Sequence, residues 1–453
     1  MISKKIVSFS VNRPKLVIIF SLAIILALGI QIRKIKVDTD PENILSSTEP
    51  VRLSHNETKK EFNLHDFIIV GIVNEHDPDG VFNPKSLDHI YSITQQIEKI
   101  PGVITNDLMS PSTMEAIIQA GPGAVRFEWL MDHPPKDRQG ALEIRQRALD
   151  NPLLKGTLVS EDGKAISLFI PLEHKDISYK VSRQIRQIIQ KYSDQEKFYI
   201  TGLPVAEDTF GMEMFRQISI STPLAALIIF LILWIFFKKI SLIISPMLVA
   251  GMSVASAMGL LIGMGYPVHI MSSMIPIFLI PIAVVDSVHI LSEFYDLYPQ
   301  YKDQKKTILK VMDHLFMPML YTSLTSAVGF ASLAFTPIPS VRLFGVMVAF
   351  GIIMAWVLTI TFIPAYIMMI PADKLRHYGD PVMEKGEGKK ISLLEKFISF
   401  QGKLTWRHEK IILSLTIGII ILSIIGITRL NINDNPVKWF TRSHPIRVAD
   451  RVL

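Results

Sequence analysis

The chain contains no cysteine, which excludes disulfides, thiolate nucleophiles and cysteine-ligated zinc sites. It also lacks a phosphate-binding P-loop, an H-E-x-x-H motif and a G-x-S-x-G motif, so neither ATP hydrolysis nor a familiar hydrolase is indicated. Scattered histidines such as His55, His65 and His76 do not show metal-ligand spacing. We therefore expect a protein that is not an enzyme and that binds neither a metal nor an organic cofactor.

Charged residues are scarce as well, because they make up 19% of the 453 residues whereas hydrophobic residues make up 49%. Successive apolar windows of about 20 residues match the hydrocarbon thickness of a bilayer, which indicates a polytopic membrane protein. The basic residues behind the net charge of +6 cluster beside the apolar runs. In that position they act as topology signals, so we expect no nucleic-acid partner.

The first apolar run ends in the basic residues Arg33, Lys34 and Lys36 without a small-x-small cleavage site, which indicates an uncleaved anchor. Four stretches rich in lysine and arginine fall on one side if the apolar segments alternate, and the positive-inside rule makes that side cytoplasmic. We therefore expect a multi-pass protein of the cell (inner) membrane with a cytoplasmic N-terminus. The predicted membrane segments are about residues 16–32, 222–237, 243–264, 268–292, 315–335, 343–370 and 411–427.

The long region between the first two segments is predicted to be extracytoplasmic. Its pattern reads as βαβ, a polar helical insertion, then ββαβ, with HDFIIVGIV, GVITND, GTLVS, AISLFIPL and KFYITG as strands. This order predicts an α+β domain that is ferredoxin-like, a split βαβ unit with an insertion, and another α+β domain is the alternative. The predicted division is 1–32, 33–217 (extracytoplasmic domain), 218–370 (helices two to six), 371–410 (cytoplasmic linker), 411–428 (helix seven) and 429–453 (start of a second extracytoplasmic domain).

The sequence repeats itself at an offset of 395 residues, where KLVIIFSLAIILALGIQIRKIKVDTDPENILSSTEPVR lies without gaps over KIILSLTIGIIILSIIGITRLNINDNPVKWFTRSHPIR. Pro41 then lies opposite Pro436. In the polar tail that follows, Arg52 lies opposite Arg447. We infer that a second copy of a six-helix unit begins near Lys396 and is truncated after its first helix. The missing second repeat is an expected partner, in the same chain or in a separate one.

Small residues recur every four positions in the third apolar segment, at Gly251, Ala255, Gly259 and Gly263. On a helix this spacing forms one smooth stripe on which another helix packs closely. We predict a packing role for this stripe and no ligand role.

The fourth segment, PIAVVDSVHIL, places Asp286 and His289 within an apolar run. A charged side chain near the bilayer centre costs at least about 2.5 to 3.5 kcal/mol, so its default interpretation is functional. At about 100° per residue, Asp286, His289 and Glu293 share one helix face and form a polar stripe toward the cytoplasm. We predict that Asp286 carries protons, and a purely structural hydrogen bond is the alternative.

The fifth segment contains YTSLTSA, whose hydroxyl groups lie at a depth similar to that of Asp286. These groups are predicted to form a hydrogen-bonding shell around the carboxylate. The alternative is that they bond to their own helix backbone, as Ser and Thr often do in membrane helices. The predicted proton-relay set is Asp286, Ser287, His289, Tyr321, Thr322, Thr325 and Ser326, with Ser323 also within reach.

Together, VDTDPENIL after the first helix, PIAVVDSVHIL in the fourth and TSLTSAVGFASLAFTPIPSVRLFGVMVAFGIIMAWVLTITFIPA across the fifth and sixth resemble the resistance-nodulation-division (RND) superfamily, in particular the MMPL-like hydrophobe and amphiphile exporters. The resemblance covers essentially the whole chain. It implies two six-helix repeats, each with an extracytoplasmic domain, and export of lipids or other amphiphiles driven by the proton-motive force. Asp286 falls where the family has its proton-carrying aspartate.

Two departures limit this comparison. Ser287 follows the aspartate where mycobacterial members often have tyrosine, and the helix that normally supplies the second half of the relay lies beyond Leu453. The expected partners are a lipid or amphiphile substrate, the membrane and the second repeat, with a homo-oligomer or a periplasmic adaptor as further candidates. A sensor or scaffold of the sterol-sensing type and an accessory to protein secretion are the alternative functions.

Overall fold

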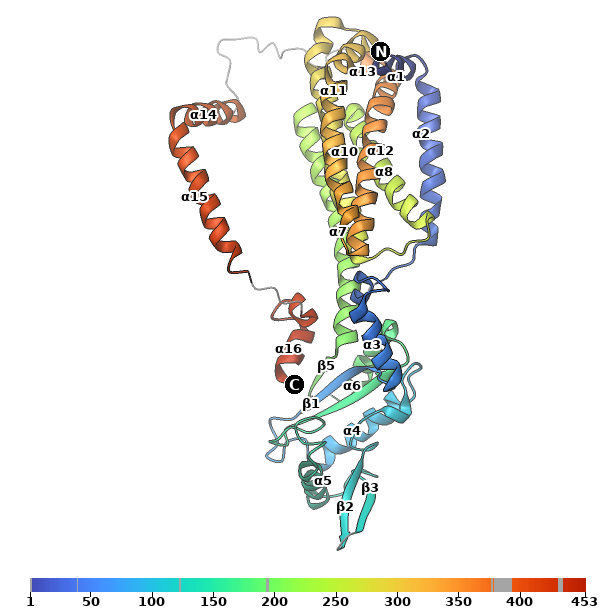
Figure 1. Ribbon diagram of the computed structural model, residues 1–453, viewed down its shortest axis with the longest axis vertical. Helices are drawn as coiled ribbons and strands as arrows, with labels where there is room; N and C mark the ends of the chain where they lie inside the picture. The colour runs from blue at the N-terminus through green and yellow to red at the C-terminus, as the bar shows by residue number, and fades with distance from the viewer. Residues whose placement is uncertain are drawn as a thin grey trace. The chain divides into compact units, whose positions relative to one another are not determined.

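The computed structural model describes residues 2–38, 40–121, 124–192, 195–375, 378, 393–430 and 435–453. The chain divides into two compact units, Met1–Gly379 with Pro436–Leu453, and Asp380–Asn435. The larger unit contains a helical bundle and a sheet domain (Figure 1). The smaller unit contains α14 (Leu393–Arg407) and α15 (Glu409–Ile427).

The bundle is built from long apolar helices that pack side by side. Among the described residues of the whole chain, six helices are long and apolar enough to cross a membrane, which confirms the predicted polytopic membrane protein at that level. The bundle helices are α1 (Ile2–Asn12), α2 (Pro14–Gly29, extended by the 3-10 helix η1 to Lys34), α7 (Leu203–Phe237), α8 (Ile240–Gly263), α9 (Ile270–Ser273), α10 (Ile275–Tyr301), α11 (Gln304–Ala331), α12 (Pro339–Met369) and α13 (Ala372–Leu375).

The predicted segment 315–335 lies mostly in α11, which is not among those six helices. The lysines of its first turns and the hydroxyls of YTSLTSA lower its hydropathy. α11 nevertheless packs along both α10 and α12 within the bundle. Its crossing of the membrane stays a prediction.

The sheet domain has a core between a three-stranded antiparallel sheet and two helices. The strand order is β4 (Ala165–Leu172), β1 (Asp66–Val73), β5 (Lys197–Thr201), with β1 in the centre. Alternate β1 residues Ile68, Val70 and Ile72 are fully buried, and they pack in one cluster with the apolar faces of α4 (Pro84–Ile97) and α6 (Ser178–Ile189). The period of two in the strand and of three to four in the helices makes this packing possible.

Two of the predicted strands are not regular strands. GVITND makes only isolated bridges to β4, through Val103 and, just beyond it, Met109, because the 3-10 helix η3 (Thr105–Asp107) interrupts the pairing. GTLVS makes one bridge to β4, at Val159. The insertion holds a helix, α5 (Arg138–Asp150), and also a hairpin of β2 (Glu115–Gly121) and β3 (Ala124–Trp129) that the sequence pattern did not indicate.

One continuous helix, α7, belongs to both parts of the larger unit (Figure 1). Its first turn buries Val205 in the sheet-domain core, and its last turns bury Leu233 and Phe237 in the bundle core. At 1.5 Å per residue its 35 residues span about 50 Å, well beyond the roughly 20 residues that a bilayer requires. Gly202 precedes it with φ 125°, where a Cβ would collide with the Phe67 carbonyl.

The sequence repeat at an offset of 395 residues is matched by a repeat of secondary structure. The 3-10 helix η2 (Pro41–Ile44) corresponds to η6 (Pro436–Trp439), and α3 (Pro50–Glu61) corresponds to α16 (Pro445–Val452). One hydrogen bond is also repeated. Arg52 Nη1 donates to the Leu45 carbonyl over 2.9 Å, and Arg447 Nη1 donates to the Phe440 carbonyl over 3.0 Å.

Candidate functional site

Asp286 lies in the middle of α10 and is 5% exposed. Ser323 of α11, 6% exposed, donates its hydroxyl hydrogen to Asp286 Oδ2 over 2.5 Å. In the described part of the chain, no lysine, arginine or histidine forms an ion pair with this carboxyl and no other side chain hydrogen-bonds to it. A buried carboxylate with a single donor and no ion-pair partner is costly, whereas its protonated form is neutral. The arrangement is therefore suited to binding and releasing a proton.

A second pair of hydroxyls lies one residue further along α10. Ser287 donates to the Ala283 carbonyl over 3.1 Å, and its Oγ is 3.5 Å from Thr359 Oγ1 on α12. Both side chains are fully buried. Thr359 was not expected from the sequence, because nothing in the local pattern of α12 distinguishes it from a threonine bonded to its own helix.

The other predicted relay residues do not gather around Asp286. Tyr321 is 60% exposed on the bundle surface. Thr322 and Thr325 donate to carbonyls of their own helix, those of Pro318 and Thr322, which is the arrangement expected under the alternative interpretation. Ser326 is half-buried with no hydrogen bond to the carboxyl.

The polar stripe toward the end of α10 lies partly at the surface of the bundle and partly against α11. His289 is exposed one turn below Asp286. A further turn along, Glu293 pairs with His314 of α11 at 3.2 Å. These groups lie between the buried acid and the end of the bundle where α10 turns into α11, so they could exchange protons with water there.

The stripe of small residues on α8 faces a neighbouring helix over half of its length. A Cβ at Gly259 would collide with the Leu28 carbonyl at the end of α2, and one at Gly263 would lie 3.2 Å from Gln31 Cγ. By contrast, a Cβ at Gly251 would meet nothing within 4 Å. Ala255, between them, is half-buried. Close approach of α2 to α8 therefore depends on Gly259 and Gly263.

Two cavities lie along α7, one in each part of the larger unit. The first is a groove of about 550 Å³ between α7 and α10, lined by apolar side chains such as Leu233, Phe236 and Val285. The second, of about 470 Å³, lies between α6, α7 and the start of α16. Thus a single helix borders an apolar groove in the bundle and a polar pocket in the sheet domain.

The polar pocket is rich in arginine. Arg183 and Arg186 of α6 and Arg216 of α7 line it, and in the described part of the chain none of the three forms an ion pair. His444 closes one side, where its Nδ1 accepts the Ile446 N–H and its Nε2 lies 3.3 Å from Glu213. Three unpaired guanidinium groups against one carboxylate leave the pocket with an excess of positive charge, which suits an anionic group.

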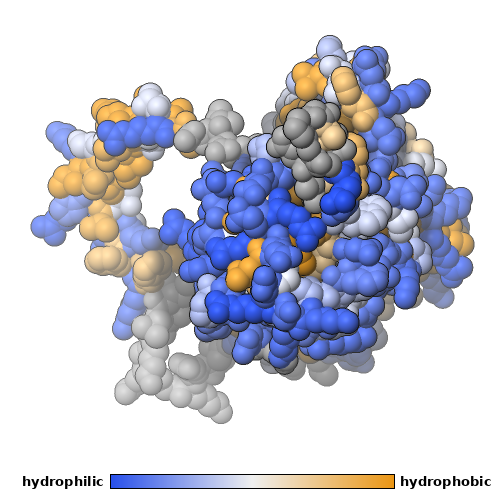
Figure 2. Space-filling view, turned by 90° about the horizontal axis from the view of Figure 1, so that it is seen from below, coloured by the Kyte–Doolittle hydropathy of each residue, from blue (hydrophilic) through white to orange (hydrophobic). Residues whose placement is uncertain are grey.

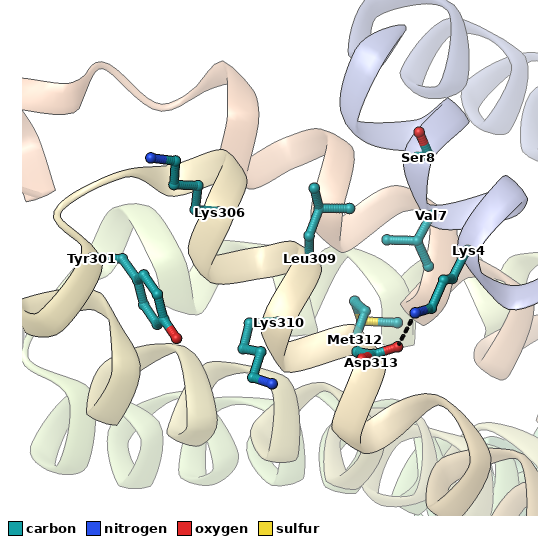
Figure 3. Close-up of a pocket in the computed structure, with 9 residues that line it drawn as sticks. All are labelled: Lys4, Val7, Ser8, Tyr301, Lys306, Leu309, Lys310, Met312 and Asp313. Atoms are coloured by element: carbon teal, nitrogen blue, oxygen red, sulfur yellow. Dashed lines mark ion pairs between the residues drawn. The ribbon is translucent and has the colours of Figure 1, made fainter.

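A third cavity, of about 570 Å³, lies where α1 crosses the start of α11 (Figure 3). Three lysines line it, Lys4, Lys306 and Lys310, and Lys4 pairs with Asp313 at 3.2 Å (Figure 3). Its apolar wall includes Val7. The cavity lies at the same end of the bundle as the lysine-rich turns predicted to be cytoplasmic.

An ionic cluster joins the sheet domain to the stretch that follows the first membrane helix. Lys175 Nζ lies 2.6 Å from Asp40, 2.9 Å from Glu42 and 3.7 Å from Glu207 of α7. Burial opposes the ionisation of Glu42, but the hydrogen bond and charge of Lys175 outweigh it and lower the pKa of Glu42. Burial likewise opposes the charge of Lys175, and Asp40 and Glu42 together raise its pKa. No pattern in the sequence indicated this cluster, because Lys175 is remote in the chain from Asp40 and Glu42.

The fold and the buried acid define a class, a polytopic membrane protein whose bundle contains an isolated ionisable group. The model of the MMPL family matches residues 105–382, which is more than half of the chain, so the chain belongs to the MMPL family, within the RND superfamily. A membrane protein of Methanocaldococcus jannaschii is 22% identical over 381 residues, covering 81% of this chain and 94% of that protein. Family membership indicates an RND-type membrane transporter of hydrophobic substrates.

Proposed function

We propose that this chain is the N-terminal half of an RND-type exporter that uses the proton-motive force to move lipids or other amphiphiles. The observation that carries the proposal is the buried Asp286, which has one hydroxyl donor, Ser323, and no ion-pair partner in the described part of the chain. In this proposal the N-terminus is cytoplasmic, and the sheet domain is a ferredoxin-like unit on the other side of the inner membrane.

Protons would enter Asp286 from the sheet-domain side and leave toward the cytoplasm, past His289 and the Glu293–His314 pair. A proton moving down the membrane potential releases about 2.3 kcal/mol per 100 mV. When Asp286 is charged, it holds the Ser323 hydroxyl and with it α11. Protonation removes the charge and weakens this charge-assisted bond, so α10 and α11 are free to shift relative to each other. This two-state contact is the proposed link between proton and conformation.

A second repeat completes the mechanism in this proposal. Support comes from the 395-residue offset, which relates η2 to η6 and α3 to α16 and repeats the hydrogen bond of Arg52 in Arg447. A group from the second repeat would then complete the relay that Asp286 begins. The chain supplying that repeat is either the same polypeptide or a separate one.

The two cavities along α7 support an amphiphilic substrate. The groove at Leu233 suits an acyl chain, and the pocket at Arg216 suits an anionic head. Arg216 and Leu233 are 17 residues apart on one helix, or about 26 Å at 1.5 Å per residue. An amphiphile moving along α7 would exchange contact with the groove for contact with the arginines.

Asp286→Asn in the complete protein tests the proton role. In everted membrane vesicles, we expect proton-driven transport of a lipophilic dye such as Nile red to fall about tenfold or more, because the amide cannot carry a proton. Ser253→Ala is the matched control, since Ser253 is buried in the neighbouring α8 and has no hydrogen-bond partner in the described part of the chain. Undiminished transport in the Asp286→Asn protein would refute the proton role of Asp286, whereas no proton-driven transport by the wild-type protein would favour a non-transporting sensor.

A further inference from the structure

Two contacts hold α1 alongside the first turns of α11. Lys4 pairs with Asp313 at 3.2 Å, and Lys305 Nζ donates to Asn12 Oδ1 over 2.7 Å. The two contacts lie eight residues apart on each helix, or about 12 Å at 1.5 Å per residue, so the helices run antiparallel here. The cavity of about 570 Å³ lies between these contacts, because the residues that line it on each helix fall within these intervals.

The cavity combines unpaired cations with an apolar wall (Figure 3). Lys306 and Lys310, one turn apart on α11, are exposed, and neither forms an ion pair in the described part of the chain. Asp313 is the only carboxylate among the lining residues, and it is engaged with Lys4. An ammonium group on a flexible stem can turn toward an anion, so the cavity suits a negatively charged group. The apolar part of the wall comes from both helices, through Val7, Leu309 and Met312.

The cavity lies where two candidate membrane spans end. α1 leads directly into the span Pro14–Lys34, and Tyr301, which lines the cavity, is the last residue of the span Ile270–Tyr301. At the opposite end of the larger unit, the sheet domain presents a mainly hydrophilic surface (Figure 2). The α1 end of the bundle is therefore the end that borders lipid headgroups. Basic pockets between membrane helices at such a surface are suited to anionic headgroups.

An apolar stripe continues from the cavity along α11. After Asp313 it comprises Met317, Tyr321, Leu324 and Val328, which follow at intervals of three or four residues and so share one helix face. Each of the four is 48% to 60% exposed. From Met317 to Val328 the stripe is about 16 Å long, close to half of the roughly 30 Å hydrocarbon core of a bilayer. With α11 crossing the membrane as predicted, this is the depth that the acyl chains of one leaflet occupy.

We propose that the cavity between α1 and α11 binds the headgroup of an anionic phospholipid from the surrounding leaflet, with one acyl chain along the stripe of α11. A free phosphate compound is a poorer occupant, because it has no apolar part to place against Leu309 and the stripe. The site lies outside the proposed transport path. Because α11 also carries Ser323, a bound lipid would restrain the shift of α11 in the proposed function, whereas the binding itself does not depend on that function.

The complete protein in a neutral detergent is titrated with palmitoyl-oleoyl phosphatidylglycerol, or with phosphatidylcholine of the same chains, and bound lipid is counted by native mass spectrometry. We expect the wild-type protein to prefer phosphatidylglycerol, and the double variant Lys306→Gln/Lys310→Gln to bind it about tenfold or more weakly. The matched control is Lys5→Gln/Lys374→Gln, which removes the same charge from exposed lysines that do not line the cavity. Its affinity for phosphatidylglycerol should equal that of the wild-type protein.

Asp313→Asn removes the carboxylate that repels the headgroup and releases Lys4, so it should bind phosphatidylglycerol severalfold more tightly, a gain that misfolding cannot produce. Equal affinity for the two lipids, equal weakening in both double variants, or no gain in Asp313→Asn would overturn the proposal. Competition by glycerophosphoglycerol or inorganic phosphate at the concentrations at which the lipid binds would assign the cavity to a free phosphate compound, which also overturns it. The titration needs no proton gradient, so an Asp286→Asn protein that still transports would refute the proton role and leave the lipid site untouched.

Discussion

Replacing Gly259 by alanine is a sensitive test of how the first membrane helix packs in the bundle. An added Cβ would lie 2.5 Å from the carbonyl carbon of Leu28 and closer still to its oxygen, whereas ordinary contacts begin near 3.4 Å. The obstacle is backbone, so no side-chain rotation relieves it. α2 and α8 must therefore separate by about 1 Å, which loosens the close packing that small residues allow.

The magnitude follows from two opposing effects. Alanine is more favourable than glycine in a helix interior by about 1 kcal/mol, and overpacking a tight contact costs about 1 to 3 kcal/mol. Gly251→Ala gains the first effect without the second, because a Cβ there meets nothing within 4 Å. We therefore expect Gly251→Ala to be neutral or stabilising and Gly259→Ala to be less stable than it by about 1 to 3 kcal/mol.

The measurement is the apparent unfolding temperature of both variants in the same detergent, followed by tryptophan fluorescence. A difference of 1 kcal/mol corresponds to about 2 to 4 °C in a protein of 150 to 250 residues and to less in a larger one. The order of the two variants is the decisive readout. If Gly259→Ala unfolds at or above the temperature of Gly251→Ala, α2 does not approach α8 at Leu28 and the reasoning fails.

Two further variants test contacts that the sequence did not determine. Ser323→Ala removes the only side-chain donor to Asp286 in the described part of the chain, and we expect slower proton-driven dye transport. Thr325→Ala is the control that should leave transport unchanged, because the Thr325 hydroxyl bonds to its own helix. Lys175→Met leaves the carboxylates of this cluster without their cation. The loss should lower the free energy of unfolding by about 2 kcal/mol, a value between the typical contributions of exposed and buried salt bridges. Because the pKa of Glu42 is lowered and that of Lys175 is raised, the wild-type advantage in unfolding temperature should fall as the pH drops below 4.5 and acid protonates Glu42. It should also fall as the pH rises above 10.5 and base deprotonates Lys175.

Hydropathy and spacing predicted the parts of the structure that depend on the chain locally. The long apolar helices and the strands HDFIIVGIV and AISLFIPL all follow from runs and alternation in the sequence. The second strand was wrong because GVITND can satisfy its backbone in a 3-10 turn at Thr105, a choice that periodicity does not distinguish over so short a stretch. The β2–β3 hairpin was missed although Gly121-Pro122-Gly123 is a turn signal, because the whole region was interpreted as a polar helical insertion.

The candidate site depends on contacts that local sequence patterns do not predict. Helical rise placed YTSLTSA at the depth of Asp286, but depth does not determine rotation about the helix axis. Packing of α11 between α10 and α12 rotates Ser323 inward and turns Tyr321 to the surface. The contact of Ser287 with Thr359 and the cluster around Lys175 join residues far apart in the chain, and a single sequence contains no signal for such pairs.

α7 is the element through which a shift at Asp286 would reach the sheet domain. Its cytoplasm-proximal turns, in the proposed topology, pack on α10 around Leu233, and its first turns contribute Val205 to the sheet-domain core. A regular helix transmits displacement along its axis, because every backbone hydrogen bond resists stretching. Pro223 interrupts this ladder between the two ends, since it has no N–H to donate and its ring clashes with the preceding turn. Bending of α7 is therefore expected at Pro223, so that motion of α10 would be converted into a tilt of the sheet domain instead of a translation.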